Sequence, residues 1–287
     1  MVTHADTVGP EPTAARVALW RARHIELDAL PHILADDIGL RLVAPTGDWR
    51  RRADMHADRT KPFRASIVGR ARFVEDLVVE QLGRGVRQYV ILGAGLDSFT
   101  QRHPDALASG LAIFEVDQPG PQAWKRQRLR DLGFELPSGL HLVPLDFEMG
   151  EDWRDAIVAA GFDTEHPTIA ASLGVSMYLT KEATAATLRQ AAGLASGSSF
   201  IMSFLLPVAL ANPEIRHGLE QSAKGAQAHG TPWISYFTPD EIVDMARQVG
   251  FASARHVSTT ELAERFFKGR SDGLKPVRAE ELLVATS

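Results

Sequence analysis

The sequence of 287 residues contains no cysteine. This absence excludes disulfide bonds, zinc sites built from thiolates and catalytic thiol nucleophiles. An excess of positive charge is absent as well, because 31 lysines and arginines stand against 36 aspartates and glutamates, for a formal net charge of −5. Such a chain has no overall field that attracts nucleic acid or an anionic membrane surface. We therefore expect neither of them as a partner.

Long hydrophobic runs are also missing. The longest apolar stretches, 201–206 and 208–211, are separated by a proline, and both are too short to cross a bilayer. No basic start followed by an apolar run, typical of a secretory signal, occurs at the N-terminus, so we expect a cytoplasmic protein. Residues 1–12 are polar and punctuated by proline and glycine, which predicts a disordered tail. The histidines show no metal-ligand spacing, so we expect no metal site.

The rest of the chain has an ordinary globular composition, with 45% hydrophobic and 23% charged residues. From residue 88 onward, apolar runs of strand length alternate with helical patterns. This alternation predicts an α/β fold with a doubly wound, mostly parallel sheet of seven strands and helices on both faces. The last two strands have no obvious full helix between them, so the final strand is free to enter the sheet antiparallel, as a hairpin.

We expect one domain over residues 13–287. Its first part, 13–85, is predicted to be a helical cap with helices at 13–30 and 62–82, joined across 46–62 by a solvated loop. Residues 208–236 are irregular and rich in proline, glycine, histidine and asparagine, which predicts a lid inserted after the fifth strand. Thr238 precedes a helical pattern with proline and acids at its start, and it is the expected N-cap.

Two glycines and an aspartate stand at the ends of the first two predicted strands. The first strand runs into Gly93-Ala94-Gly95, and the second ends in Asp117. In a doubly wound sheet, ligands bind outside the carboxyl ends of the strands. Glycines allow the backbone to approach a ligand closely, and an acid at the second strand can accept hydrogen bonds from both ribose hydroxyls. The pair indicates a cofactor that contains a nucleoside.

The next residues distinguish between cofactors. A dinucleotide site uses a third glycine that packs the following helix beneath a pyrophosphate, whereas here Ser98 stands in that position. Asp97 would place a negative charge where phosphates bind. A cofactor without phosphate and with a cationic amino-acid end tolerates this acid better, so S-adenosylmethionine fits and NAD does not. The sequence also has no P-loop motif.

A third acid, Asp146, follows the third predicted strand and is itself followed by Phe147. An aspartate there can accept a hydrogen bond from an adenine amino group, while the aromatic ring packs on the base. The alternative role for Asp146 is that of a loop cap.

The motifs in this order resemble those of the leucine carboxyl methyltransferase-like family of class I S-adenosylmethionine-dependent methyltransferases, which includes actinobacterial and polyketide O-methyltransferase branches. The resemblance starts in the segments RARHIELDALPHILADDIGLRLV and GRARFVEDLV. It continues through VILGAGLDS, FEVDQP, Lys125, LDF and GVSMYLTKEA. It covers the chain from about residue 15 to the C-terminus.

The resemblance implies roles for individual residues. Arg70 would pair with the methionine carboxylate of the cofactor, and Gly93 would lie against it. Asp117 would hold the ribose, and Asp146 with Phe147 would hold the adenine. One departure is that Leu173 stands where many members carry a glutamate that contacts the cofactor. This difference places one cofactor contact in question.

The methyl acceptor is expected between the N-terminal helices and the 208–236 insertion. That insertion contains His217, His229, Trp233 and Tyr236, a mixture suited to an aromatic or apolar small molecule. Tyr178 would face the methyl group, and His229 is the candidate general base. His217 is interpreted as a solvated helix residue.

Four hypotheses of function follow. The first is O-methylation of a carboxylate or hydroxyl of a small molecule, in secondary metabolism. The others are carboxyl methylation of a protein or peptide C-terminus, a binding protein that keeps the fold without turnover, and a nicotinamide oxidoreductase. Ser98 and Asp97 disfavour the last, and only Leu173 supports the third.

Overall fold

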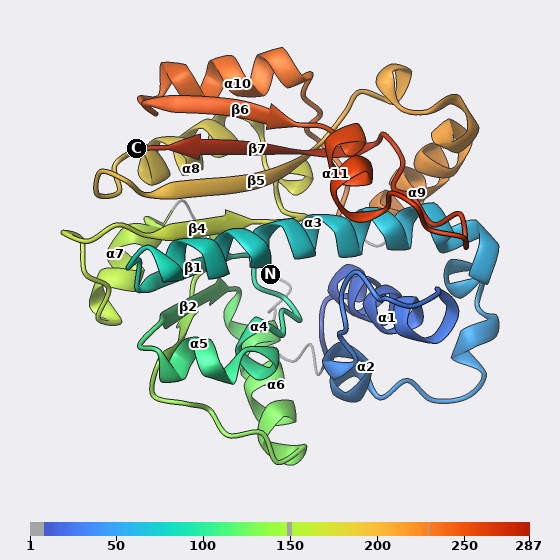
Figure 1. Cartoon of the computed structure of the whole chain (residues 1–287), viewed down its shortest axis with the longest axis horizontal. Helices are drawn as coiled ribbons and strands as arrows, with labels where there is room; N and C mark the ends of the chain where they lie inside the picture. The colour runs from blue at the N-terminus through green and yellow to red at the C-terminus, as the bar shows by residue number, and fades with distance from the viewer. Residues whose placement is uncertain (1–8, 148–150, 229) are drawn as a thin grey trace, which may run out of the picture.

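A seven-stranded sheet forms the centre of the molecule (Figure 1). The computed structural model describes residues 9–147, 151–228 and 230–287. The strand order is β3-β2-β1-β4-β5-β7-β6; β7 runs antiparallel to its neighbours β5 and β6, and the other neighbouring pairs are parallel. The strands are β1 Gln88–Leu92, β2 Ala112–Asp117, β3 Leu140–Pro144, β4 Ile169–Ser172, β5 Ser199–Leu205, β6 Ser253–Val257 and β7 Glu280–Thr286. The predicted doubly wound, mostly parallel sheet is confirmed.

Helices cover both faces of this sheet and bury its apolar side chains. On one face, α7, α8 and α10 pack against the strands through Trp153, Leu188 and Ile242. On the other face, α3 runs across the sheet with α4, α5 and α11 beside it, as Figure 1 shows. The helices are α1 Pro12–Leu27, α2 Ile38–Val43, α3 Ala57–Gly83, α4 Phe99–Arg102, α5 Pro104–Ala108, α6 Pro119–Asp131, α7 Trp153–Ala159, α8 Lys181–Ala192, α9 Arg216–Ala228, α10 Pro239–Gln248 and α11 Thr259–Phe266.

The connection between the last two strands, β6 and β7, differs from the expected hairpin. The last strand is antiparallel, as allowed from the sequence, and it lies between β5 and β6. However, β6 and β7 are not joined as a hairpin, because α11 stands between them. Ser258 caps this helix, since its side chain accepts a hydrogen bond from the Glu261 amide. Eight residues with a single cap are a weak sequence signal, which explains why the helix was missed.

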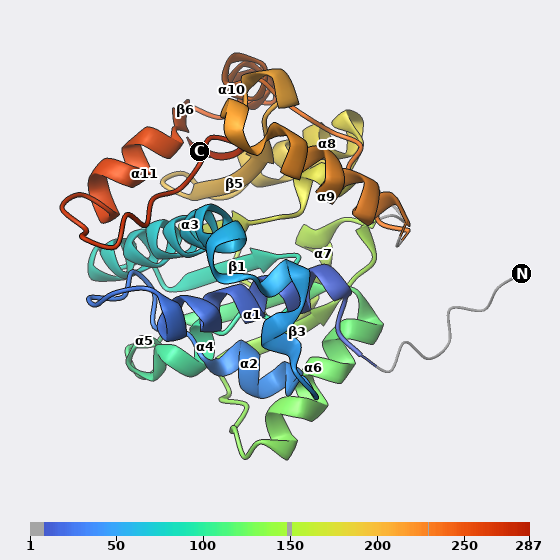
Figure 2. The same ribbon diagram turned by 90° about the vertical axis from the view of Figure 1, so that its right-hand side faces the viewer.

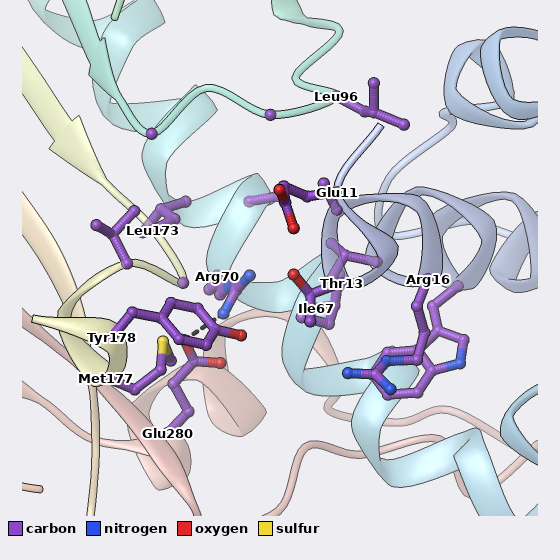
Figure 3. A pocket seen from close by; sticks show the side chains of 18 of the residues that line it. Glu11, Thr13, Arg16, Ile67, Arg70, Leu96, Leu173, Met177, Tyr178 and Glu280 are labelled. Carbon is purple, nitrogen blue, oxygen red and sulfur yellow. Dashed lines mark hydrogen bonds and ion pairs between the residues drawn. The ribbon is translucent and has the colours of Figure 1, made fainter. Parts of the chain in front are cut away.

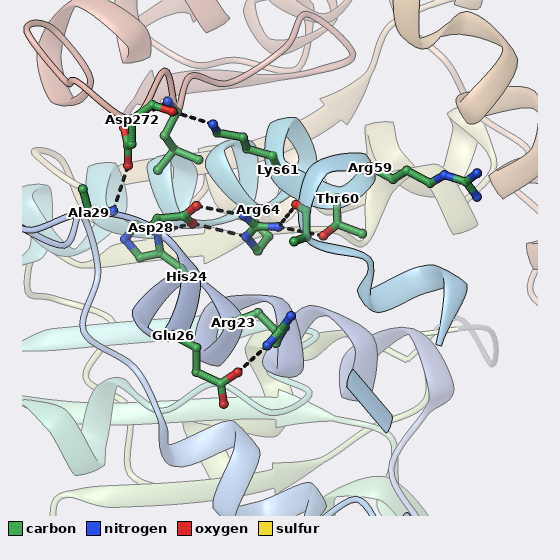
Figure 4. A network of polar contacts seen from close by, with 12 residues as sticks. Arg23, His24, Glu26, Asp28, Ala29, Arg59, Thr60, Lys61, Arg64 and Asp272 are labelled. Carbon is green, nitrogen blue, oxygen red and sulfur yellow. Dashed lines mark hydrogen bonds and ion pairs between the residues drawn. The ribbon is translucent and has the colours of Figure 1, made fainter. Parts of the chain in front are cut away.

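The N-terminal helices lie over the carboxyl edge of the sheet, and a buried polar network holds α1 to α3 (Figure 4). The Arg64 guanidinium donates to both carboxylate oxygens of Asp28, with Nη2–Oδ1 at 2.8 Å and Nε–Oδ2 at 3.2 Å. His24 is fully buried, and its Nδ1 lies 2.9 Å from Asp28 while its Nε2 accepts from the Ile33 amide. Burial alone would raise the pKa of Asp28, but the hydrogen bonds from His24 and Arg64 bring it below its ordinary value. The carboxylate therefore stays charged between the two helices.

The expected solvated loop at 46–62 is wrong in two respects. Trp49 and Met55 are buried and pack against Leu19 of α1. In addition, α3 begins at Ala57, five residues before the predicted start, and Pro62 lies inside the helix. His56 caps the helix by accepting from the Arg59 amide. Proline is favoured at the first position of a helix, so the sequence pattern predicted that α3 begins at Pro62. In the structure Pro62 stands in the second turn.

Thr238 caps α10 as predicted, and it does so in a complete capping box. Its hydroxyl accepts from the Glu241 amide at 3.2 Å, while the Glu241 carboxylate accepts from the Thr238 amide at 2.7 Å. We expect Thr238→Ala to lower the free energy of unfolding by about 1 kcal/mol, because one amide of the first turn loses its partner. Urea unfolding measures this change. Thr164→Ala, at an exposed loop position, is the matched control and should change stability by less than about 0.5 kcal/mol. Equal losses in both variants would contradict the capping role.

Candidate functional site

A cavity of about 710 Å³ opens at the carboxyl ends of the central strands. Its floor includes Gly93 after β1, Asp117 at the end of β2 and Leu173 after β4. Side chains of α1 and α3 and the segment 230–234 form its walls, as Figure 3 shows in part. Pro10 and Glu11 also line it, and α1 begins at Pro12; residues 1–8, in the predicted disordered tail, lie outside the described part of the chain.

The turn after β1 requires glycine at Gly93. This residue has φ of +70°, and a Cβ built on it would lie 2.4 Å from a methyl carbon of Val175. Gly95 also has a positive φ, and its Cβ would lie 3.3 Å from the Ala14 side chain of α1. Both glycines therefore leave backbone rather than side chain exposed to the cavity. This cradle fits a ligand that lies directly against the main chain.

Asp117 is bound to the same turn by its carboxylate. One oxygen accepts from the Gln118 amide at 2.7 Å, and the other accepts from the Gly95 amide. A carboxylate has about four acceptor sites, so two remain for a ligand in the cavity. Burial raises the pKa of Asp117 above its ordinary value, although the amides of Gly95 and Gln118 oppose the shift. The structure thus brings Gly93, Gly95 and Asp117 together, in an arrangement able to receive a pair of hydroxyls.

A buried ion pair lies beneath this end of β2. The ammonium of Lys125, on α6, lies 2.6 Å from the carboxylate of Glu115, and both side chains are 1% exposed. Glu115 stands two residues before Asp117 in β2. Lys125 belongs to the sequence motif, but its partner could not be identified from spacing alone.

The residues after the glycine turn do not form a pyrophosphate site. The helix that follows, α4, has only four residues. Ser98 is buried; it donates to Asp36 at 2.8 Å and accepts from Arg102 at 3.0 Å. Asp97 lines the cavity and accepts from the Phe99 amide. A phosphate here would meet carboxylates instead of a helix N-terminus, which agrees with the argument against a dinucleotide.

Arg70 projects from α3 into the cavity and forms an ion pair with Glu280, the first residue of β7 (Figure 3). Arg70 is 8% exposed, and its guanidinium lies so close to the turn after β4 that a Cβ at Gly174 would be 3.0 Å from Nη2. The sequence indicated Arg70 only through the family resemblance. Glu280 was missed, because no motif marks it and only the pairing of β7 with β5 brings it here.

Among the other predicted site residues, Phe147, Leu173 and Tyr178 line the cavity. Tyr178 ends the turn Ser176–Tyr178 after β4, and its hydroxyl points into the cavity in Figure 3. Asp146 is half-buried and is not among the lining residues; its backbone amide donates to the Glu151 carboxylate. Its expected contact with the adenine stays a prediction. His229 lies outside the described residues.

The insertion 208–236 is more regular than expected, because Arg216–Ala228 forms α9. Trp233 lines the cavity as predicted. Tyr236 lines only a small neighbouring recess, and His217 is not among the lining residues of either. The insertion thus contributes one wall, mainly through α9 and the segment that follows it.

The far wall of the cavity carries aromatic rings and two arginines. Trp20 of α1 and Phe63 of α3 stack with their ring centroids 6.0 Å apart. Arg16 lies near the Trp20 ring, with 5.7 Å between its guanidinium carbon and the ring centroid, and Arg59 lies on α3. Neither arginine forms an ion pair with any residue that the structure describes. This wall suits a flat apolar body that carries negative charge.

The described ranges contain neither a cluster of metal ligands nor a membrane-spanning helix. There, histidine, aspartate and glutamate side chains form no group of three that could hold a metal ion. In that same part of the chain, each helix is too short or too polar to traverse a bilayer.

The family model of leucine carboxyl methyltransferases matches residues 14–192, which is more than half of the chain. The chain belongs to the leucine carboxyl methyltransferase family. The matched region includes Arg70, the glycine turn, Asp117 and Tyr178. The floor of the cavity is therefore built from the part of the chain that matches the family model. The predicted family is confirmed.

Relatives in sequence agree with this membership. YktD of Bacillus subtilis, which carries the provisional name of an S-adenosyl-L-methionine-dependent methyltransferase, is 34% identical over 208 residues, covering 72% of this chain and 67% of YktD. A Mycolicibacterium gilvum protein of the same provisional name is 35% identical over 177 residues, covering 58% of this chain and 56% of that protein. The chain thus spans between half and about two thirds of the length of these family members.

Two solved structures share the fold of this leucine carboxyl methyltransferase family member. One is a duf574 family protein from Streptomyces avermitilis, with a TM-score of 0.58 at 16% identity, covering 96% of this chain and 97% of the other. The second is a Thermobifida fusca protein provisionally named a methyltransferase, with a TM-score of 0.56 at 17% identity, covering 98% and 96%. At this identity they show the class I fold alone.

Proposed function

We propose that this methyltransferase-family chain transfers a methyl group from S-adenosylmethionine to an oxygen, either carboxylate or hydroxyl, of a small molecule. The observation that carries the proposal is the cradle of Gly93, Gly95 and Asp117 at the carboxyl edge of the sheet. It offers bare backbone and a carboxylate with free acceptor sites, which fits an adenosyl group without phosphates. The sequence relatives that carry the provisional name of S-adenosyl-L-methionine-dependent methyltransferases support the same cofactor.

Each cofactor-binding residue has a distinct task in this proposal. Asp117 receives the ribose hydroxyls, and Gly93 and Gly95 allow the main chain to touch the cofactor. Phe147 packs on the adenine, and Arg70 receives the methionine carboxylate through its guanidinium fork. Asp146 remains a sequence-based candidate for the adenine amino group, without a place in the cavity wall.

The cofactor supplies the reactive methyl group and the leaving group, so the protein mainly aligns and desolvates the reactants. The hydroxyl of Tyr178 points into the cavity, where it can orient the acceptor oxygen. His229 is still our sequence-based candidate for a general base. A carboxylate acceptor would need no base, whereas an alcohol or phenol would gain about 10²–10⁴-fold from one.

The acceptor is proposed to lie against the far wall. Trp20, Phe63 and Trp233 supply apolar surface there, and Arg16 and Arg59 supply positive charge that no described acid neutralises. An aromatic or apolar molecule with an anionic group fits this wall. The family resemblance, rather than the geometry, suggests a place in secondary metabolism.

Calorimetric titration with S-adenosylhomocysteine, followed by a screen of small carboxylates and phenols with radiolabelled methyl donor, tests the proposal. We expect binding near micromolar and labelled product from at least one acceptor. Gly93→Val is the inactive control, because its side chain would collide with Val175 at a positive φ. Binding of NADH without binding of S-adenosylhomocysteine would favour an oxidoreductase, and binding without transfer would favour a protein that has lost turnover.

A further inference from the structure

The ion pair between Arg70 and Glu280 stands inside the wall of the cavity. Its two side chains are 10% and 13% exposed, and both residues line the cavity. Arg70 projects from α3, while Glu280 begins β7 and pairs with Leu205 of β5. In Figure 3 the dashed line that joins Arg70 to Glu280 is drawn beside the ring of Tyr178. A positive and a negative group thus face the cavity side by side.

Both members of this pair keep unused bonding capacity. A guanidinium carries five N–H donors, and a carboxylate has about four acceptor sites. Among the described residues, the single hydrogen bond of each side chain joins Arg70 Nη1 to Glu280 Oε1. Ile67, three residues before Arg70 on α3, and Leu173 of the cavity floor are apolar and cannot form a hydrogen bond with either group through their side chains. Groups with so much free capacity in a cavity wall are suited to bind a ligand that carries both charges.

An α-amino acid in its zwitterionic form is such a ligand. Its carboxylate and ammonium are attached to the same carbon. The carboxylate can therefore bind a guanidinium while the ammonium binds a carboxylate beside it. We propose that Glu280 binds the α-ammonium of the methionine end of S-adenosylmethionine while Arg70 binds its carboxylate. This inference rests on the proposed function, and it assigns a role to Glu280 that no sequence motif provides.

Other acids of the cavity are less suited to this task. Glu75 is already paired with Arg102 and lies 3.1 Å from His103. Asp117 serves the turn and the ribose. Glu11, at the N-cap of α1, lines the cavity but makes no ion pair with Arg70 or with another described residue. Glu280 is the acid that lies directly beside the proposed carboxylate receptor.

A pair of ligands tests the proposal by calorimetry. One is S-adenosylhomocysteine, and the other is 4-(adenosylthio)butanoate, which is the same molecule without its amino group. Wild-type protein should bind the second about 10- to 100-fold more weakly, since a hydrogen bond between charged groups is lost. In Glu280→Gln, affinity for S-adenosylhomocysteine should fall by the same factor and affinity for the butanoate should stay. The ratio between the two ligands should therefore approach one.

Controls separate this role from a structural one. Methylthioadenosine, which lacks the whole amino-acid end, should bind wild type and Glu280→Gln alike and thereby report an intact fold. Equal weakening of both acid-bearing ligands in Glu280→Gln would show that Glu280 acts only by positioning Arg70, and it would overturn the proposal. Equal affinity of wild type for both ligands would overturn it without any variant.

Glu11→Gln is the matched acidic control, and it should keep the wild-type ratio between the two ligands. Collapse of the ratio in this variant instead of in Glu280→Gln would move the ammonium site to α1. Failure of wild-type protein to bind S-adenosylhomocysteine at all would be a failure of the proposed function, which is a different result from any of these.

Discussion

Asp117→Ala should bind S-adenosylhomocysteine at least 100-fold more weakly than the wild-type protein. The ribose hydroxyls would lose two hydrogen bonds to a carboxylate, each of which contributes about 1.5–3 kcal/mol. At 1.4 kcal/mol per factor of ten, the sum corresponds to a loss of about 10²–10⁴-fold. The Gly95 amide would also lose its acceptor, so the turn itself would be held less firmly. Calorimetric titration at neutral pH measures the change.

The control for this variant is Asp105→Ala. Asp105 is an exposed aspartate of α5 that does not line the cavity. Its replacement should change the affinity by less than about threefold. Unfolding curves of both variants would show that the fold persists. Wild-type affinity in Asp117→Ala, or a comparable loss in Asp105→Ala, would show that the adenosyl group does not lie where we propose.

Lys125→Met should lower the free energy of unfolding by about 3–5 kcal/mol. The variant leaves the Glu115 carboxylate buried without its cation, and an unpaired buried charge carries a penalty of this size. Burial already raises the pKa of Glu115 in the presence of Lys125, and the charged neighbours Asp97 and Asp117 act in the same direction. Urea unfolding at neutral pH measures the loss. In the double variant Glu115→Leu/Lys125→Met, most of the stability should return.

The pH dependence of this loss has a definite sign. A carboxyl whose pKa is higher in the folded than in the unfolded state takes up its proton preferentially when folded, so it favours folding at low pH and less so as the pH rises. The deficit of Lys125→Met should therefore be largest near neutral pH and should narrow as the pH falls. Arg247→Met, which breaks an exposed pair with Asp244, should cost less than about 1 kcal/mol at any pH. A deficit of Lys125→Met that widens on acidification would contradict the buried-charge explanation.

The sequence predicted those parts of the site that depend on local patterns. Gly93 and Asp117 could be identified because each directly follows or ends a buried strand, and parallel strands place these ends at one edge of the sheet. Thr238 could be identified because a capping box lies within four consecutive residues. In both cases the interacting groups are close in sequence or fixed by sheet geometry.

The parts that could not be predicted depend on partners distant in sequence. Glu280 meets Arg70 across 210 positions, and Glu115 meets Lys125 only because α6 packs against β2. The sequence around Trp49 has no helical or strand periodicity, so it predicted an exposed loop, whereas the structure buries Trp49 against α1. Such contacts are decided by tertiary packing, which overrides local preference.

The reversed direction of β7 has a consequence for assembly. Were this strand parallel to β5, its first residue would lie at the opposite edge of the sheet, far from the cavity; as it runs, Ala279 and Glu280 complete the wall. During synthesis, residues 70–178 emerge from the ribosome long before Glu280 does, yet β7 must insert between β5 and β6 before the wall is closed. The wall of the cavity is therefore complete only once the last strand has paired with its neighbours.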